Sequence, residues 1–289
     1  AKYPENTLSA FRAAISAGAH AVETDPHITK DEVVVLSHDA NLKRCYGEDI
    51  KIADKTWDEI KDLRTTQKPH ERIPRLADLL RYLAQEGNEH IWVFLDIKLG
   101  NDADDIMRLV ASTLSSNPSQ ASAPWNERIV LGLWAVKYLA PAQQYLPGYP
   151  MMHIAFSATY ARRFLDVANV GFNMMFYALL MPGGKRFLRD AQQKYQRKVL
   201  SWTINGEDHM KWCIRKGLDG VVTDEVEKYL EVAERFDEDR EKEPFLPVEL
   251  KVLWAAFKSF VWVKILLVFY SGKMQLNMPD GFSKKKVGK

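Results

Sequence analysis

Two acidic residues and a histidine lie close together early in the chain, in an order that suits metal-dependent proton transfer. Glu23 and Asp25 sit two positions apart in an apolar stretch, which predicts a strand that presents both carboxylates on one face. A second apolar stretch ends in His38 and Asp39. Carboxylate oxygens bind hard divalent cations, and an imidazole exchanges protons near neutral pH. The pattern therefore predicts a divalent cation beside a proton-transfer group.

A third acid follows the same logic further along the chain. Asp96 stands near the end of the apolar stretch Ile91–Ile97, and Lys98 comes two positions later. A lone Glu-x-Asp pair is more typical of a solvated strand edge, but charges on a buried strand need partners. The combination therefore favours a metal site. His27 continues the face of the first two acids, but Pro26 interrupts the strand and predicts a loop position for it.

The chain alternates apolar stretches of strand length with amphipathic stretches of helix length, which is typical of βαβ units and a parallel sheet. The polar residues of interest, at positions 25, 38, 96, 202 and 224, stand at the ends of strands spread along the chain. A closed barrel brings such ends to one face, and no glycine-rich dinucleotide loop follows any strand. We therefore expect a (β/α)8 TIM barrel, with a further strand upstream of Ala1. The eight strands predicted within the chain are Ala21–Asp25, Val33–Ser37, Ile91–Ile97, Arg128–Leu133, Met151–Phe156, Gly171–Met175, Lys198–Thr203 and Gly220–Thr223.

Composition and charge argue against some classes of binding partner and cellular location. The 289 residues carry a net charge of +2, which argues against a nucleic-acid partner. Cys45 and Cys213 are too few for a disulfide framework, which favours an intracellular location. The last 41 residues hold eight lysines and two acids, a local charge of +6 that leaves about −4 for the remainder.

The distribution of charge and apolar residues predicts three segments. Residues 1–240 would form the barrel, 241–248 a linker, and 249–289 a hydrophobic, basic tail that begins with an apolar helix. Lys258 and Lys264 interrupt that helix, so a helix lying in the membrane interface is favoured over one that spans it. The alternative is a core helix packed on the barrel.

Five motifs occur in order along the chain: Pro4-Glu5-Asn6-Thr7, Glu23-x-Asp25, His38-Asp39, Asp96-Ile97-Lys98 and Gly217–Asp224. Together they resemble the glycerophosphodiester phosphodiesterase family. Within that family, Asp96 in place of glutamate, the stretches Glu127–Trp134 and Trp202–Asn205, and the hydrophobic C-terminal tail are similar to the fungal phosphatidylglycerol-specific phospholipases C.

The resemblance implies a metal-dependent barrel hydrolase. By it, Glu23, Asp25 and Asp96 would ligate Mg²⁺ or Ca²⁺, and His38 would be one of two histidines that act as general acid and base. The other histidine belongs to a His-Arg pair that in the family precedes the Pro-Glu-Asn motif. That position falls before Ala1, so we expect the printed chain by itself to be inactive. Lys98 would reach the phosphate oxygens. Glu5 would hold the substrate or the arginine of the His-Arg pair, and Trp202 would stack on the glycerol or form the wall of the pocket.

The resemblance predicts a membrane-associated phospholipase C that cleaves phosphatidylglycerol to diacylglycerol and glycerol phosphate. Two alternatives stay open: a glycerophosphodiesterase or lysophospholipase D, and a non-catalytic lipid-binding protein. The expected partners are a phospholipid substrate and a membrane surface, on lipid droplets, the endoplasmic reticulum or mitochondria.

Overall fold

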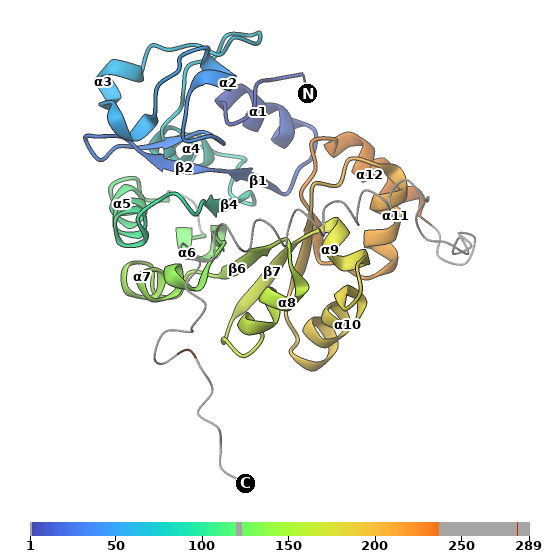
Figure 1. Ribbon diagram of the computed structural model, residues 1–289. Helices are drawn as coiled ribbons and strands as arrows, with labels where there is room; N and C mark the ends of the chain where they lie inside the picture. The colour runs from blue at the N-terminus through green and yellow to red at the C-terminus, as the bar shows by residue number, and fades with distance from the viewer. Residues whose placement is uncertain (1, 120–122, 237–281, 283–289) are drawn as a thin grey trace. The chain divides into compact units, whose positions relative to one another are not determined.

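The computed structural model describes residues 2–119, 123–236 and 282, which form two compact units divided between Pro150 and Met151. In each unit parallel strands alternate with helices along the chain, which is the predicted α/β pattern (Figure 1). The predicted linker 241–248 and, apart from Phe282, the predicted tail 249–289 lie outside the described residues.

The first unit contains three parallel strands, β1 (Ala21–Thr24), β4 (Trp92–Ile97) and β5 (Ile129–Leu133), in this order. Asp96 is the one polar residue of β4 after Trp92, and every residue from 93 to 97 is buried, as expected of a strand covered on both faces. Strand pairing aligns Thr24 with Leu95. The carboxyl ends of β1 and β4 therefore bring residues 25 and 96 level with each other.

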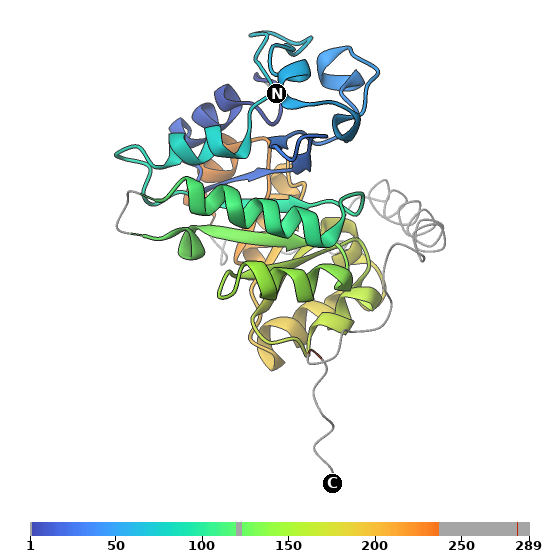
Figure 2. The ribbon, with the colours of Figure 1, turned by 90° about the vertical axis from the view of Figure 1, so that its left-hand side faces the viewer.

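The helices of the first unit form where apolar residues recur at helical spacing. In α4 (Leu76–Leu83), four leucines at positions 76, 79, 80 and 83 occupy one face and are fully buried. Thr7 caps α1 (Leu8–Ser16) by accepting a hydrogen bond from the Ala10 amide. The remaining helices are α5 (Ala103–Ser116), α6 (Trp125–Arg128), η2 (Val136–Tyr138) and α7 (Leu139–Tyr145). Helix α5 packs between α4 and α7 (Figure 2).

An insert between β1 and α4 has a hydrophobic core of its own. Its strands β2 (Pro26–Ile28) and β3 (Val34–Leu36) pair antiparallel and stand apart from the parallel strands. The insert also contains α2 (Lys43–Tyr46), η1 (Ile52–Asp54) and α3 (Trp57–Ile60). Its core consists of Val35, Leu42, Tyr46, Ile52, Ile60 and Ile73.

Two predictions fail in this insert. Val33–Ser37 is not a barrel strand, because β3 pairs with β2 and buries Val35 in the local core. The parallel strands of the described chain therefore number three in the first unit and four in the second, one fewer than the eight predicted. His27 is not a loop residue either: it lies in β2 with 6% of its surface exposed. A proline is accepted at the first position of a strand, so Pro26 does not prevent β2 from forming.

The second unit contains four parallel strands in chain order: β6 (Met151–Ala155), β7 (Val170–Met175), β8 (Val199–Trp202) and β9 (Gly220–Val221). A Cβ atom at Gly184 would lie 2.4 Å from the carbonyl oxygens of Ala178 and Leu179, so the tight turn between α9 and α10 requires glycine there. The helices are α8 (Ala158–Ala161), η3 (Arg162–Phe164), α9 (Phe176–Leu180), α10 (Gly184–Arg189), the π-helical η4 (Asp190–Lys194), α11 (Glu207–Arg215) and α12 (Val226–Arg235).

The described helices are short. The longest, α5, has 14 residues, and none of the helices in the described ranges combines the length and the hydrophobicity that crossing a bilayer requires.

Candidate metal centre

Three carboxylates meet at the carboxyl ends of β1 and β4. Glu23 lies in β1, Asp25 directly follows it, and Asp96 lies one residue before the end of β4. One oxygen from each of the three lies within 4.8 Å of the others. The alignment of Thr24 with Leu95 explains the meeting, because the next residue on each strand is an aspartate. We call Glu23, Asp25 and Asp96 the acidic triad.

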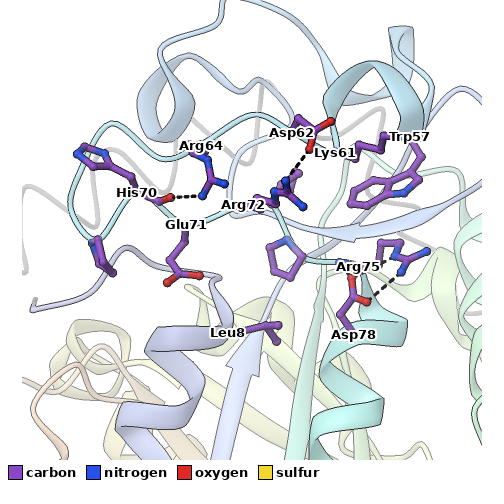
Figure 3. A pocket seen from close by; sticks show the side chains of 13 residues that line it. Leu8, Trp57, Lys61, Asp62, Arg64, His70, Glu71, Arg72, Arg75 and Asp78 are labelled. Atoms are coloured by element: carbon purple, nitrogen blue, oxygen red, sulfur yellow. Dashed lines mark hydrogen bonds and ion pairs between the residues drawn. The ribbon is translucent and has the colours of Figure 1, made fainter.

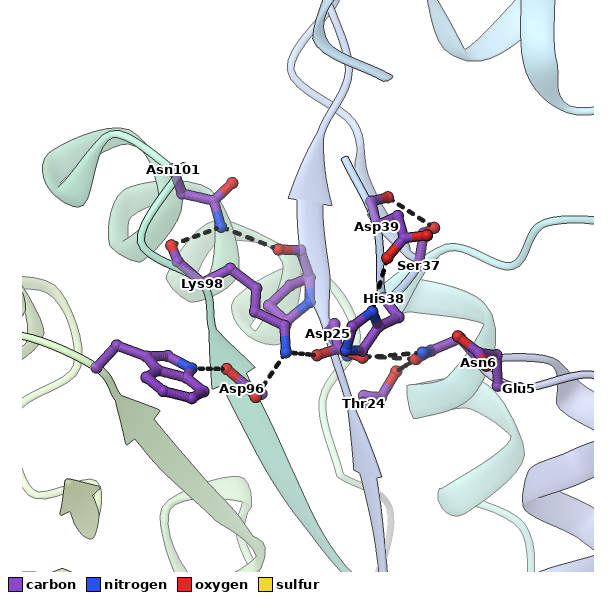
Figure 4. A network of polar contacts seen from close by, with 12 residues as sticks. Glu5, Asn6, Thr24, Asp25, Ser37, His38, Asp39, Asp96, Lys98 and Asn101 are labelled. Carbon is purple, nitrogen blue, oxygen red and sulfur yellow. Dashed lines mark hydrogen bonds and ion pairs between the residues drawn. The ribbon is translucent and has the colours of Figure 1, made fainter. Parts of the chain in front are cut away.

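The two aspartates of the acidic triad are buried and share one cationic partner. Asp25 is 1% exposed and Asp96 7%. The Lys98 ammonium lies 2.8 Å from Asp25 Oδ1 and 2.9 Å from Asp96 Oδ2 (Figure 4). Burial, aided by the charge of Asp25, raises the pKa of Asp96 to about 6. Burial lowers the pKa of Lys98, but the charges of Asp96 and Asp25 outweigh it and the net shift is upward. One ammonium thus serves two buried carboxylates.

The donor set fits a divalent cation. Asp25 Oδ1 is buried and accepts no hydrogen bond of normal geometry, although the Lys98 ammonium is near enough to form an ion pair. A carboxylate oxygen has two lone pairs, so Asp25 Oδ1 can coordinate a cation in addition to its ion pair with Lys98. Three carboxylates and no sulfur or imidazole nitrogen suit a hard cation such as Mg²⁺ or Ca²⁺ and not zinc.

Asn6 and Trp134, which were not predicted to lie at the site, hold the two aspartates of the acidic triad in position. The Asn6 side-chain amide donates to Asp25 Oδ2 at 2.9 Å, and its carbonyl oxygen accepts from the Asp25 amide at 3.2 Å and from the Thr24 hydroxyl. The Trp134 indole donates to Asp96 Oδ1 at 2.5 Å. Each buried aspartate therefore has its own uncharged donor, which fixes the carboxylate and leaves its other oxygen toward Lys98.

His38 leaves β3 beside the acidic triad. The amide of the preceding residue, Ser37, donates to the Asp25 carbonyl at 2.9 Å, which fixes the strand end there. His38 Nδ1 lies 2.8 Å from Asp39 Oδ1 (Figure 4). A hydrogen bond from Arg44 lowers the pKa of Asp39 to about 2. Because an ionised carboxylate only accepts hydrogen bonds, Nδ1 carries the proton in this contact.

The remaining predicted site residues have different surroundings. Glu5 forms a two-pronged ion pair with Arg44, a partner that the sequence analysis did not name. That hydrogen bond also lowers the pKa of Glu5. Trp202 belongs to the second unit, where it ends β8 and its indole donates to the Asn173 carbonyl at 3.1 Å. The substrate-binding roles of Glu5 and Trp202 stay predictions.

A hollow of about 500 Å³ lies elsewhere in the first unit, among residues 57–78 and Leu8 (Figure 3). Neither the acidic triad nor His38 lines it. Much of its charge is already paired, since Arg72 contacts Asp62 and Arg75 contacts Asp78, each at 3.0 Å. The acidic triad and His38 therefore lie outside this hollow.

Comparison with solved structures shows the fold. A phosphodiesterase of Oleispira antarctica, solved in complex with sn-glycerol-3-phosphate, has a TM-score of 0.67 and 19% identity, over 81% of this chain and 92% of that one. A glycerophosphodiester phosphodiesterase of Thermotoga maritima has a TM-score of 0.61 and 26% identity, over 80% and 93%. The parallel strands and helices thus form a TIM-barrel-like α/β fold, as the sequence predicted.

Comparison with curated sequences points to the same family. A glycerophosphodiester phosphodiesterase of Caldanaerobacter subterraneus is 24% identical over 80% of this chain and 93% of its own length. The human lysophospholipase D GDPD1 is 50% identical over 56 residues, which are 19% of this chain and 18% of that protein. The model of the glycerophosphoryl diester phosphodiesterase family matches residues 1–228. Its members are phosphodiester hydrolases, and this chain, with its acidic triad where two strands end, belongs to the glycerophosphoryl diester phosphodiesterase family.

Proposed function

We propose that this protein hydrolyses the phosphodiester bond of a glycerophospholipid with the help of a divalent cation. The observation that carries the proposal is the acidic triad, whose oxygens lie within 4.8 Å of one another with the Lys98 ammonium between two of them. Such a site combines negative ligands for a metal with a positive side chain for a phosphate. The family membership of the chain supports the same reaction type.

Glu23, Asp25 and Asp96 would hold Mg²⁺ or Ca²⁺, which when bound neutralises charge on the phosphodiester. Lys98 supplies a second positive charge, and its position is fixed because both of its carboxylate partners are buried. His38, with the proton on Nδ1, accepts a proton at Nε2 from the attacking hydroxyl or returns one to the leaving oxygen. In the net reaction one P–O ester bond breaks, water supplies the new P–O bond, and the leaving oxygen gains a proton.

We favour phosphatidylglycerol as the substrate, with diacylglycerol and glycerol phosphate as products. The support comes from the sequence, in Asp96 and in the stretches Glu127–Trp134 and Trp202–Asn205. One of these features has a structural counterpart: Trp134 donates to the carboxylate of Asp96, so the shorter acid and the indole form one unit. Glu5 and Trp202 are proposed substrate contacts, and a phospholipid substrate implies that the protein works at a membrane surface.

A lysophospholipase D activity is the second candidate. The 50% identity to human lysophospholipase D GDPD1 favours it, although that match covers only 56 residues. This reaction would break the phosphodiester bond on the side of the headgroup and leave the phosphate on the lipid. The same acidic triad, Lys98 and His38 would serve it.

The products formed by the full-length protein test both candidates. The protein is incubated with phosphatidylglycerol vesicles and, separately, with lysophosphatidylcholine and with glycerophosphocholine, each with Mg²⁺ or Ca²⁺ and with a chelator. Diacylglycerol release from phosphatidylglycerol supports the favoured substrate. Choline release with lysophosphatidate as co-product supports the second candidate. No cation-dependent product from any of the three would overturn the proposed function and leave a lipid-binding role.

A further inference from the structure

An arginine in the insert connects the histidine of the candidate site to the segment that precedes α1. Arg44 lies in α2 and uses both edges of its guanidinium group. Nη1 and Nη2 donate to the two oxygens of Glu5 at 2.9 and 2.6 Å, and Nε donates to Asp39 Oδ2 at 2.6 Å. A planar guanidinium that binds one carboxylate in a bidentate manner has a fixed orientation, so its third donor is also fixed.

The second carboxylate oxygen of Asp39 contacts His38. Asp39 Oδ1 lies 2.8 Å from His38 Nδ1, so this carboxylate joins the guanidinium to the imidazole. Glu5 is followed directly by Asn6, whose amide binds Asp25 of the acidic triad. The short segment before α1 therefore supports both the metal ligands and, through Arg44, the proton-transfer residue. We call Glu5, Arg44, Asp39 and His38 the charged relay segment.

A contribution to folding stability does not explain why these four residues are connected in this way. About half of the Arg44 and Glu5 side-chain surfaces and a third of the Asp39 surface are exposed, and exposed ion pairs add little to stability. Exposure does not weaken an orienting role, because two opposed carboxylates fix the guanidinium geometrically. The low pKa of Asp39 keeps it an ionised acceptor over the whole physiological range.

We propose that Arg44 is a positioning residue: it holds the Asp39 carboxylate where that group accepts the proton of His38 Nδ1, so that Nε2 faces the reacting phosphodiester. The role in turnover rests on the proposed function, whereas the effect on the imidazole does not. Without Arg44, Asp39 rotates away from His38, and the imidazole redistributes its proton between the two nitrogens. An incorrect tautomer cannot accept a proton at Nε2.

The test compares three variants of the full-length protein: Arg44→Gln, Asp39→Asn and the double variant. If Arg44 acts through Asp39, each single change lowers kcat by about ten- to a hundredfold, the range for outer-shell partners of functional histidines, with KM nearly unchanged. The double variant then loses no more than the stronger single one, because residues that act as a unit are not additive. Arg44→Lys should recover little, since one ammonium cannot bind both carboxylates in this geometry.

A spectroscopic readout separates this proposal from the proposed function. The nitrogen shifts of His38, measured in protein labelled with ¹⁵N-histidine and assigned with His38→Gln, should show the Nδ1–H form in the wild type and a mixture in Arg44→Gln. This measurement needs no substrate. Lys43→Gln is the matched control, because Lys43 is the neighbouring cation of α2 and pairs with Asp49 at 2.8 Å. It should change neither kcat nor the His38 signals.

Three results would overturn the positioning role. Unchanged His38 signals in Arg44→Gln would show that Asp39 needs no guanidinium to hold the imidazole. Losses in kcat that add up in the double variant would show that Arg44 does not act through Asp39. A lowered melting temperature with normal kcat would show that Arg44 is only structural. If the wild type hydrolyses nothing while Arg44→Gln still shifts the tautomer, the proposed function fails and the positioning role stands.

Discussion

The two halves of the candidate site are built in different ways. The acidic triad lies at the ends of two adjacent strands, and its aspartates are almost fully buried and held by the uncharged donors Asn6 and Trp134. The charged relay segment lies on the insert and before α1, and its members are a third to a half exposed. The half that would hold the metal is therefore fixed by the sheet, whereas the half that would transfer protons is fixed by charge pairing near solvent. Substitutions in the two halves should fail in different ways.

The largest effect is expected from removing a charge of the acidic triad. Asp96→Asn keeps the size of the side chain and the bond from Trp134, but it removes one of three negative ligands. Because a metal supplies several kcal/mol of charge stabilisation to the transition state, kcat/KM should fall by about a thousandfold. Calorimetric titration with Mg²⁺ and Ca²⁺ should show weakened binding. Asp105→Asn, an exposed acid paired with Arg108, is the control. Normal cation affinity in Asp96→Asn would exclude this residue as a ligand.

Lys98 tests whether charge balance governs the buried half. Lys98→Met removes the ammonium that lies between two buried carboxylates, and breaking such a pair costs roughly 3 kcal/mol of unfolding free energy. Added Mg²⁺ or Ca²⁺ should restore part of the melting temperature, because the cation replaces the lost positive charge.

Lys211→Met is the matched control for that substitution. Lys211 is equally exposed but pairs with Glu207, which is itself more exposed. Its replacement should change the melting temperature little and create no response to cation. A Lys98→Met protein that is destabilised but insensitive to both cations would argue against a metal at the acidic triad.

The uncharged donors should have intermediate effects. Trp134→Phe keeps the ring and removes only the indole N–H that binds Asp96, so cation affinity should fall by about ten- to a hundredfold. Trp125→Phe removes a comparable bond, from the indole to the Asn117 carbonyl at 2.6 Å, and should leave cation affinity unchanged. Equal behaviour of the two variants in the titration would mean that the indole does not position Asp96.

The smallest effect is the change in folding stability that low pH causes through the charged relay segment. Arg44 lowers the pKa of Asp39 from 3.8 to about 2, so the ionised form stabilises the folded protein above pH 4 and that contribution is lost as the pH falls from about 4 to 2. With a third of the side chain exposed, the contribution should stay below about 1 kcal/mol. Chemical denaturation at pH 5 and pH 2.5 should therefore show a slightly smaller loss of stability for Asp39→Asn than for the wild type. An identical loss would show that the Arg44 pair is screened out.

The sequence predicted the parts of the site that depend on strand geometry. Because parallel strands end at one edge of a sheet, Glu23, Asp25 and Asp96 could be predicted to lie close together. The pairing of β1 with β4 follows that rule. Asn6 was missed because asparagine and threonine both cap helices well; the structure uses Thr7 as the cap and leaves Asn6 for Asp25. Trp134 was missed as a donor because its contact with Asp96 depends on the β4–β5 register.

The failed fold prediction has a related cause. The apolar residues Val33–Leu36 read as a barrel strand because a continuous hydrophobic run shows that a segment is buried but not in which core. Here Val35 packs with the insert residues Leu42 and Ile60. The local sequence pattern cannot show which of two hydrophobic cores a segment joins, since both cores are built from the same apolar side chains. The Glu5–Arg44 pair, between residues 39 positions apart, is equally invisible to local reasoning.

The position of the insert core predicts how substitutions within it should affect the site. Tyr46 and Val35 pack in that core. Arg44 lies two residues before Tyr46 in α2, and His38 lies three residues after Val35, just beyond the end of β3. A cavity opened among these apolar side chains would displace the imidazole and its guanidinium support without disturbing the strands that end in the aspartates. We expect such a substitution, which touches none of the three acids, to leave cation binding intact and to lower the rate of hydrolysis.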